Sequence, residues 1–177
     1  LLRCEHATAL VKGHDQRAVI GDVVAVSVPA AHDKGVIEAI APRTREFVRK
    51  DPTERALPQV LAANFERVIV AQPVGEVNLR RLERELVLAF ETGAAVTVVL
   101  TKGDLADEAA TAAVREAVES LAGPATEVLV VSEADPASVE AVRRLLAPGT
   151  TTVLIGRSGV GKSSLVNMLV GEAVLDV

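Results

Sequence analysis

The sequence predicts an α/β fold in two parts: a small antiparallel sheet or barrel, then a parallel sheet with helices on both faces. Two observations lead to this prediction. Residues 1–60 contain short β-branched runs separated by turn residues. Residues 67–177 alternate near-continuous apolar runs with amphipathic segments, the pattern of strands buried on both faces and joined by helices.

In the first part, three runs have the composition of strands: 7–12, 19–28 and 35–40. Residues 51–65 contain two prolines and no clear strand, so we expect a linker or domain boundary there. We therefore predict a partial first domain over 1–52, a linker over 53–66 and a partial second domain over 67–177. The charge divides along the same line, with nine basic and eight acidic residues in 1–60 but ten and sixteen in 61–177.

The second part begins with a buried strand over 67–72, and further strands are expected over 95–100, 127–131 and 151–155. Helices are expected between them, with Asn78, Asp107 and Asp135 as N-caps, and a last helix from Ser163. In the first helix, one face is expected to pack in the core, formed by Leu79, Leu82, Leu86 and Phe90.

Composition excludes several classes of protein. The single cysteine, Cys4, cannot form an internal disulfide, and with three scattered histidines it does not make a zinc site. No apolar run reaches the roughly 18 residues that span a bilayer. A net charge of −5 and only three aromatic residues argue against a chain that coats nucleic acid. We therefore expect a soluble, cytoplasmic protein without membrane contact.

The most specific motif matches G-x-x-x-x-G-K-[ST], between an apolar strand and an amphipathic helix. Its glycines let successive N–H groups converge on a phosphate, and the helix N-terminus adds positive potential. The lysine reaches the β and γ phosphates, and the following hydroxyl ligates Mg²⁺. The alternative is an ordinary glycine-rich turn. The predicted phosphate-binding residues are Gly156, Arg157, Ser158, Gly159, Val160, Gly161, Lys162, Ser163 and Ser164, with Lys162 and Ser163 as the catalytic pair and Ser163 as the Mg²⁺ ligand.

A second motif, Thr101-Lys102-Gly103-Asp104, follows a predicted strand and resembles the [NT]-K-x-D base-recognition motif of GTPases. The Asp104 carboxylate would accept from both the ring N–H and the exocyclic amine of guanine, a pair that adenine lacks, and the Lys102 stem would stack on the base. Ser132 and Glu133 end the next strand and resemble the short Ser-Ala loop of GTPases, with Glu133 in place of Ala. This resemblance implies that a backbone N–H there reaches the guanine carbonyl. The alternatives are a solvated turn for the first motif and a simple capping turn for the second.

The base-reading motifs precede the phosphate loop, the reverse of the usual order, which is typical of circularly permuted GTPases. Further segments resemble the ribosome small-subunit-dependent GTPase A (RsgA) family over nearly the whole chain. They are Gly21-Asp22, Ala41-Pro42-Arg43, Phe47-Val48-Arg49, residues 64–70, residues 79–86, Pro148-Gly149-Thr150 and residues 156–167.

This resemblance implies an OB-fold domain, a permuted GTPase domain and a C-terminal zinc-binding domain. It implies GTP or GDP and Mg²⁺ as ligands, hydrolysis stimulated by the small ribosomal subunit and its rRNA, and a role in maturation of that subunit. No Asp-x-x-Gly switch motif and no Cys/His cluster occur in the sequence. We therefore expect the switch segments and the zinc ligands to lie outside residues 1–177. We also expect a monomer.

The basic cluster Arg43, Arg45, Arg49 and Lys50 is a candidate rRNA contact, with a solvated surface as the alternative. Two other functions stay open. The chain could be a nucleotide-dependent scaffold without significant hydrolysis, or an ATP-binding protein in which the Thr101–Asp104 match is accidental.

Overall fold

The computed structural model describes residues 2–8, 17–30, 34–49 and 59–176. The chain forms two compact units, Leu1–Phe65 (unit 1) and Glu66–Val177 (unit 2). Both the strand-rich first part and the α/β second part of the predicted fold are confirmed.

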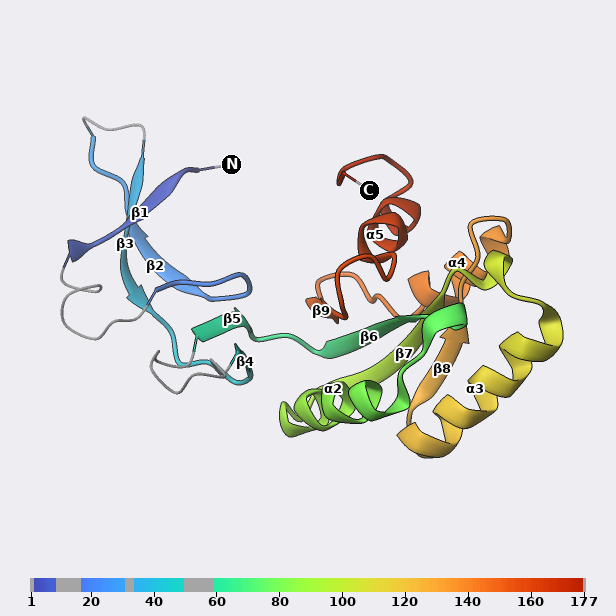
Figure 1. The fold of residues 1–177 in the computed structure, drawn as a ribbon. Helices are drawn as coiled ribbons and strands as arrows, with labels where there is room; N and C mark the ends of the chain where they lie inside the picture. The colour runs from blue at the N-terminus through green and yellow to red at the C-terminus, as the bar shows by residue number, and fades with distance from the viewer. Residues whose placement is uncertain (1, 9–16, 31–33, 50–58, 177) are drawn as a thin grey trace. The chain divides into compact units, whose positions relative to one another are not determined.

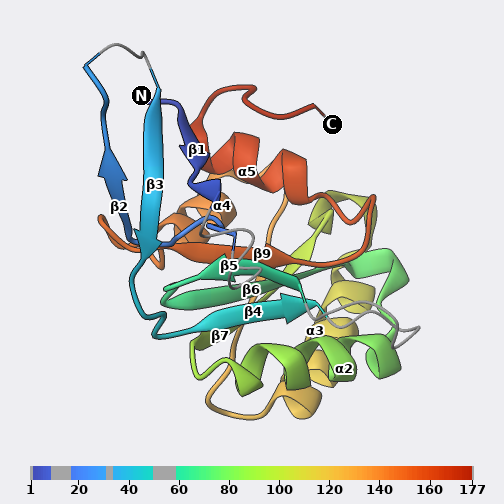
Figure 2. The same cartoon turned by 90° about the vertical axis from the view of Figure 1, so that its left-hand side faces the viewer.

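Unit 1 consists of strands in two groups (Figure 2). One is a three-stranded sheet in the order β1-β3-β2, in which β1 is parallel and β2 antiparallel to β3. The other is an antiparallel pair. The strands are β1 (Cys4–His6), β2 (Val24–Ser27), β3 (Gly35–Ile40), β4 (Glu46–Arg49) and β5 (Gln59–Ala63).

Several predictions for unit 1 need correction. The run 35–40 is confirmed as β3, but the run 19–28 forms a strand only over Val24–Ser27. A turn at Gly21, which has φ +93°, interrupts that run. Strand β5 lies inside the segment expected to be a linker, and β1 and β4 were not predicted. Most of the run 7–12 lies outside the described residues.

Unit 2 is built on a parallel sheet in the order β8-β7-β6-β9. The central strands β6 and β7 are almost completely buried, which explains their continuous apolar sequence. All four predicted strands are confirmed to within a residue or two: β6 (Arg67–Pro73), β7 (Ala95–Thr101), β8 (Glu127–Val130) and β9 (Thr152–Ile155).

Helices α2 and α3 lie on one side of this sheet, and α4 and α5 on the other (Figure 1). The predicted N-caps are confirmed, because the side chains of Asn78, Asp107 and Asp135 each accept a backbone hydrogen bond in the first turn. The helices are α2 (Leu79–Glu91), α3 (Glu108–Ala122), α4 (Pro136–Arg143) and α5 (Lys162–Val170), with single 3-10 turns η1 (Val74–Glu76) and η2 (Gly103–Leu105).

The core-facing side of α2 differs from the predicted one. Leu82, Leu86 and Ala89 are buried, whereas Leu79 and Phe90 are 42% and 47% exposed. The apolar arc is wider than the contact with the sheet, and the buried side includes Ala89, a residue that the large-hydrophobe pattern did not mark.

On the opposite face of the sheet, α4 and α5 cover a second apolar layer. Val139 and Val142 of α4 and Leu165 of α5 pack with Ile69, Val99 and Val131. This layer fixes the start of α5, and therefore the phosphate loop, against the strands.

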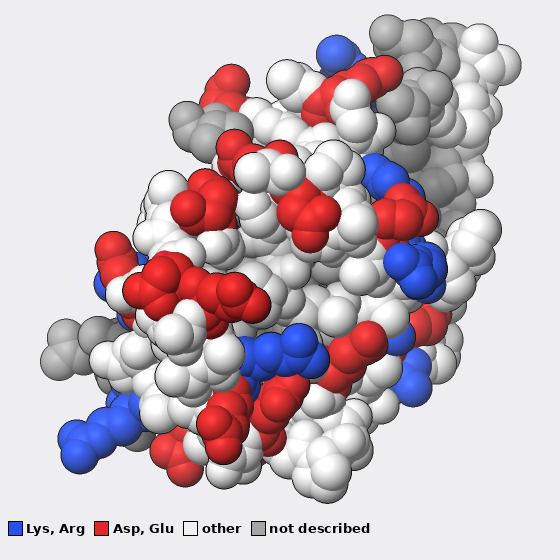
Figure 3. Space-filling model, turned by 90° about the vertical axis from the view of Figure 1, so that its right-hand side faces the viewer, with Lys and Arg blue, Asp and Glu red and all other residues white. Residues whose placement is uncertain are grey.

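Among the described residues, no helix is long and apolar enough to cross a bilayer. The same part of the chain contains no group of three or more His, Cys, Asp or Glu that could hold a metal ion. On the face beside α3, acidic side chains are more numerous than basic ones (Figure 3).

Candidate functional site

Three loops meet at the carboxyl end of the unit 2 sheet, where open parallel sheets bind ligands. They follow β7, β8 and β9, and they contain the predicted base-reading and phosphate-binding residues. The fold thus brings together motifs that are about fifty residues apart in the sequence.

The loop after β9 turns on three glycines with positive φ: 144° at Gly156, 81° at Gly159 and 92° at Gly161. A Cβ at Gly156 would lie 2.6 Å from the carbonyl oxygen of Ala71, so only glycine fits beside β6. The loop ends at Gly161, the N-cap of α5, where no side chain caps the free N–H groups. This arrangement leaves backbone donors and the positive end of the helix for an anion.

The two predicted catalytic residues lie in the first turn of α5. The Lys162 ammonium donates to the carbonyls of Gly156 at 2.9 Å and Arg157 at 2.7 Å, which folds its side chain back along the loop. Ser163 is half-buried, and no hydrogen bond of its hydroxyl is found among the described residues. Of the other loop residues, Arg157 is paired with Glu76 across 3.3 Å, and Ser158 is exposed.

Hydrogen bonds join the base-reading loop to the phosphate loop. The buried Thr101 hydroxyl donates to the carbonyl of Val160 at 2.5 Å. The Lys102 ammonium donates to the carbonyl of Gly159 at 3.0 Å. Lys102 also has φ +59°, a left-handed conformation that costs a non-glycine residue about 1–2 kcal/mol. Thr101 and Lys102 therefore also fix the position of the loop after β7 relative to the loop after β9.

A cavity of about 270 Å³ lies between these loops. The Asp104 carboxylate lines it, is exposed, and has no hydrogen bond or ion pair within the described part of the chain. It is therefore free to accept two donors from a ligand. The cavity is lined by Thr101, Lys102, Asp104, Leu105, Val131, Glu133, Gly161, Ser164 and Met168.

The two residues predicted after β8 have different positions. Glu133 lines the cavity, whereas Ser132 does not. The Ser132 hydroxyl instead accepts from the N–H of Ala134 at 3.1 Å, so it stabilises the turn that carries Glu133. Gly103 packs against the same region, with its N–H donating to the carbonyl of Val131 at 3.0 Å.

The sequence pattern did not point to Leu105 or Met168 as cavity residues. Met168 lies four residues after Ser164 on α5, so helical spacing from a predicted site residue could have found it. Leu105 lies in η2 directly after the base motif and is 75% exposed. An exposed leucine beside a cavity supplies an apolar edge for a flat ring.

The residues present fit a phosphate and Mg²⁺. The glycine cradle has no room for a Cβ at Gly156, and the Ser163 hydroxyl would supply one oxygen ligand. Mg²⁺ typically binds through one or two protein groups together with substrate phosphates. For zinc, the described residues contain no ligand cluster.

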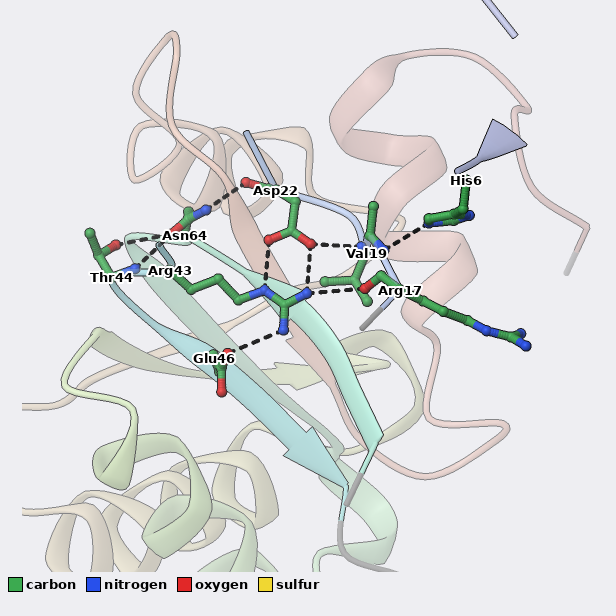
Figure 4. A network of polar contacts seen from close by, with 10 residues as sticks. His6, Arg17, Val19, Asp22, Arg43, Thr44, Glu46 and Asn64 are labelled. Carbon is green, nitrogen blue, oxygen red and sulfur yellow. Dashed lines mark hydrogen bonds and ion pairs between the residues drawn. The ribbon is translucent and has the colours of Figure 1, made fainter. Parts of the chain in front are cut away.

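Arg43, a member of the predicted basic cluster in unit 1, is bonded within the fold. Arg43 is bonded to both carboxylate oxygens of Asp22, at 2.7 and 2.8 Å, and its Nη1 and Nη2 also donate to Glu46 and to the carbonyl of Arg17 (Figure 4). Its side chain is 12% exposed. Folding brings Asp22, 21 residues earlier, to the Arg43 guanidinium, so most of its donors are used within unit 1 and the structure gives no support to Arg43 as an rRNA contact.

The other members of that cluster give little support to an rRNA contact. Arg45 is half-buried and donates to the carbonyl of Phe65 at 3.4 Å. The side chains of Arg49 and Lys50 lie outside the described residues.

The Asp22–Arg43 pair shifts both pKa values. Burial alone would raise the pKa of Asp22, but the bonds from Arg43 and from the N–H of Val19 outweigh it and lower that pKa below its usual value. The bond to Asp22 raises the pKa of Arg43. Both groups are therefore charged at neutral pH, and the pair stabilises the fold of unit 1.

The sequence of this chain is similar to those of several curated proteins. The chain is 40% identical over 173 residues to the small ribosomal subunit biogenesis GTPase RsgA of Streptomyces coelicolor, covering 96% of the chain and 46% of that protein. It is 35% identical over 161 residues to the protein of the same name from Methanosarcina acetivorans, covering 90% of the chain and 42% of that protein. The chain thus spans somewhat less than half the length of these relatives.

Solved structures show the same fold. The chain superposes on YjeQ from Thermotoga maritima with a TM-score of 0.72 and 27% identity, covering 94% of this chain and 55% of that one. It superposes on YloQ, described as a circularly permuted GTPase, with a TM-score of 0.66 and 22% identity, covering 94% of this chain and 54% of that one. The family model described as RsgA GTPase matches residues 40–177. With the phosphate loop following the base-reading loop in a parallel β8-β7-β6-β9 sheet, the chain belongs to the RsgA GTPase family.

Proposed function

We propose that unit 2 binds a guanine nucleotide, with its phosphates on the loop Gly156–Ser163 and its base in the 270 Å³ cavity. The observation that carries this proposal is the Asp104 carboxylate, which lines the cavity and has no partner in the described residues. A carboxylate there accepts from the ring N–H and the exocyclic amine of guanine. Adenine presents no such pair of donors, so it leaves the carboxylate unsatisfied.

The protein to which this chain belongs is, on this proposal, a GTPase of small ribosomal subunit maturation. The names of its relatives support this role. We further propose residues 1–52 as an OB-fold-like domain, a cytoplasmic location, a monomeric state, and the small subunit with its rRNA as the partner that stimulates hydrolysis. Zinc belongs, by resemblance to the family, to a segment outside residues 1–177.

In the reaction, this chain's residues bind and orient the nucleotide. Backbone N–H groups of the loop and the start of α5 hold the phosphates. Lys162 neutralises charge that develops on the β and γ oxygens, and Ser163 holds Mg²⁺, which when bound neutralises phosphate charge. Thr101 and Lys102, bonded to the phosphate loop, keep base and phosphates in one geometry. Catalysis of this kind relies on positioning and electrostatic stabilisation.

Binding of GDP, ADP and XDP to the chain and to Asp104→Asn tests the base assignment. We expect GDP to bind at least tenfold more tightly than ADP. Asp104→Asn should weaken GDP binding at least tenfold and favour XDP, because a carboxamide N–H can donate to the C2 oxygen of xanthine. Asp107→Asn is the matched control: it lies three residues away, keeps a capping oxygen for α3 and does not line the cavity. Equal affinity for GDP and ADP would overturn the guanine assignment in favour of an ATP-type site.

A second experiment separates an enzyme from a scaffold that does not hydrolyse nucleotide. GTP turnover by the protein extended to the length of its relatives is measured with and without small ribosomal subunits. We expect stimulation by the subunits, abolished by Lys162→Ala. Nucleotide binding without turnover under either condition would instead support the scaffold.

A further inference from the structure

The turn after β8 is held by a side chain that belongs to the next helix. Ser138 lies in the first turn of α4, six residues after Ser132. Its hydroxyl accepts from the backbone N–H of Ser132 at 3.1 Å and donates to the carbonyl of Asp135 at 2.5 Å. One hydroxyl thus uses both its acceptor and its single proton to connect the two ends of the turn.

These bonds account for almost all backbone donors of the turn. The N–H of Ser132 is bonded to Ser138, that of Ala134 to the Ser132 hydroxyl, and that of Asp135 to the carbonyl of Ser132. Within the described residues, no hydrogen bond is found for the N–H of Glu133. Glu133 is the residue of this turn that lines the cavity with Asp104.

We propose that Ser138 is a positioning residue for base recognition: its hydroxyl fixes the turn so that the Glu133 N–H donates to the C6 oxygen of a guanine held by Asp104. This inference rests on the proposed guanine site. The N–H of Ser132 is withheld by Ser138, so a single donor remains, beside the double acceptor Asp104. At C6, adenine presents an amine donor to this N–H, and the two donors repel each other, which adds to the selection by Asp104.

The acidic side chain at position 133 is compatible with this assignment. A backbone donor is independent of the side chain, and Glu133 is exposed. The geometry of the turn is what matters, and it comes from Ser132, Asp135 and Ser138. Because Asp135 also caps α4 through a bond from the N–H of Ala137 at 3.0 Å, the turn and the helix start form one unit.

The test compares Ser138→Ala with Ser138→Thr, which retains a hydroxyl, and with Ser120→Ala, the removal of an exposed hydroxyl on α3. The probes are GDP and 6-thio-GDP, whose C6 sulfur is a weak acceptor. We expect Ser138→Ala to weaken GDP binding about three- to tenfold, the effect of losing one hydrogen bond. It should change 6-thio-GDP binding much less, because that ligand already lacks a strong acceptor for Glu133. Ser138→Thr should restore GDP binding, and Ser120→Ala should leave it unchanged.

Amide hydrogen exchange without nucleotide provides a second readout. In Ser138→Ala, the Ser132 amide should exchange faster, while the amides of β7 keep their protection. Unchanged exchange at Ser132, or an equal loss of GDP and 6-thio-GDP affinity, would overturn the positioning role of Ser138. Either result leaves the guanine preference of the unmodified chain intact. An absent preference for GDP over ADP would instead contradict the proposed function.

Discussion

Gly103 shows how a single position in the base-reading motif is determined by packing. It follows Lys102 at the start of η2, and a Cβ there would lie 2.9 Å from Cγ1 of Val130 and 3.3 Å from the carbonyl oxygen of Val131. Its backbone φ is not in the left-handed region, so the requirement is one of space rather than of backbone freedom. Close approach of the loops after β7 and β8 therefore depends on this glycine.

We predict that Gly103→Ala separates the two base-reading loops and lowers the free energy of unfolding of unit 2 by about 1–3 kcal/mol, the usual cost of overpacking. Gly75→Ala is the matched control, since Gly75 is also in a 3-10 turn and a Cβ there would meet nothing within 4 Å. Urea unfolding and GDP affinity are measured for both variants. Equal behaviour of the two would show that the Gly103 contact has no energetic weight.

Asp22 gives unit 1 a pH dependence of defined sign. Its side chain is 1% exposed, and its lowered pKa means that the folded state binds protons less readily than the unfolded state. The contribution to stability is therefore present above the ordinary carboxyl pKa of about 4 and is lost as the pH falls through the lowered folded value.

We predict that acidification from pH 5 to pH 3 reduces the protection of the Val19 amide, which donates to Asp22, and of the Ala63 amide in β5. Asp22→Asn should cost about 1–3 kcal/mol at neutral pH, because it leaves the largely buried Arg43 guanidinium with only the half-exposed Glu46 carboxylate as its ionic partner. The difference from the unmodified chain should shrink at low pH. The readout is amide exchange, corrected for the pH dependence of the intrinsic exchange rates. If the difference in stability between Asp22→Asn and the unmodified chain did not vary with pH, Asp22 would not be the source of the pH dependence.

At the scale of elements, α2 illustrates a helix whose apolar arc is wider than its contact with the sheet. Leu82, Leu86 and Ala89 are within 3% of complete burial, while Leu79, Val87 and Phe90 on the same arc remain 42–51% exposed. Hydrophobicity alone therefore does not identify the core of this helix. Burial follows the line of contact with β6 and β7.

We predict that Leu86→Ala lowers the free energy of unfolding by about 2–5 kcal/mol, the range for a buried leucine. Phe90→Ala removes a larger side chain but should cost less than about 1 kcal/mol, because half of that side chain is already in water. Denaturant unfolding of the two variants decides the matter. A larger cost for Phe90→Ala would restore the original assignment of Phe90 to the core.

At the scale of the whole molecule, unit 2 was predictable from sequence and unit 1 only in part. Strands such as Val96–Leu100 are buried on both faces, and Asn78, Asp107 and Asp135 are strong local caps, so their signals survive in the sequence. In unit 1, the strands have three to six residues and are defined by their pairing with other strands. Strand β5, for example, pairs with β4 and was taken for a linker. The pairing of Arg43 with Asp22 was invisible for the same reason.

The candidate site also combines residues that the sequence predicted with residues that only the structure revealed. Residues that match a motif, such as Asp104 and Lys162, were predicted from spacing, and the structure places them at the cavity and at the start of α5. Met168 and Ser138 belong to no motif, and only the packing of α4 and α5 beside the sheet gives them their neighbours. Sequence reasoning finds the groups that ligand chemistry fixes and misses those that the fold supplies.

We predict that nucleotide stabilises the two units unequally. At a GDP concentration one hundred times Kd, ligand binding adds about 2.7 kcal/mol to the free energy of unfolding of the unit that contains the site. Amide exchange should therefore slow in β6 and β7, while β3 of unit 1 keeps its rate. Equal slowing in both units would show that they open as one cooperative body.

The pairing of β6 with β9 also has a consequence for synthesis. The first strand of the sheet finds its second neighbour only after β7 and β8 have been made, and the N–H of Thr151 bonds the Glu66 carboxylate 85 residues earlier. As the chain leaves the ribosome, the base-reading loops after β7 and β8 emerge first, and one edge of β6 stays unpaired until residue 155 appears. In a GTPase of ordinary order the phosphate loop emerges first. In this chain, the proposed nucleotide site cannot form before strands β6 to β9 have all been made, so nucleotide binding would follow the assembly of these four strands rather than initiate it.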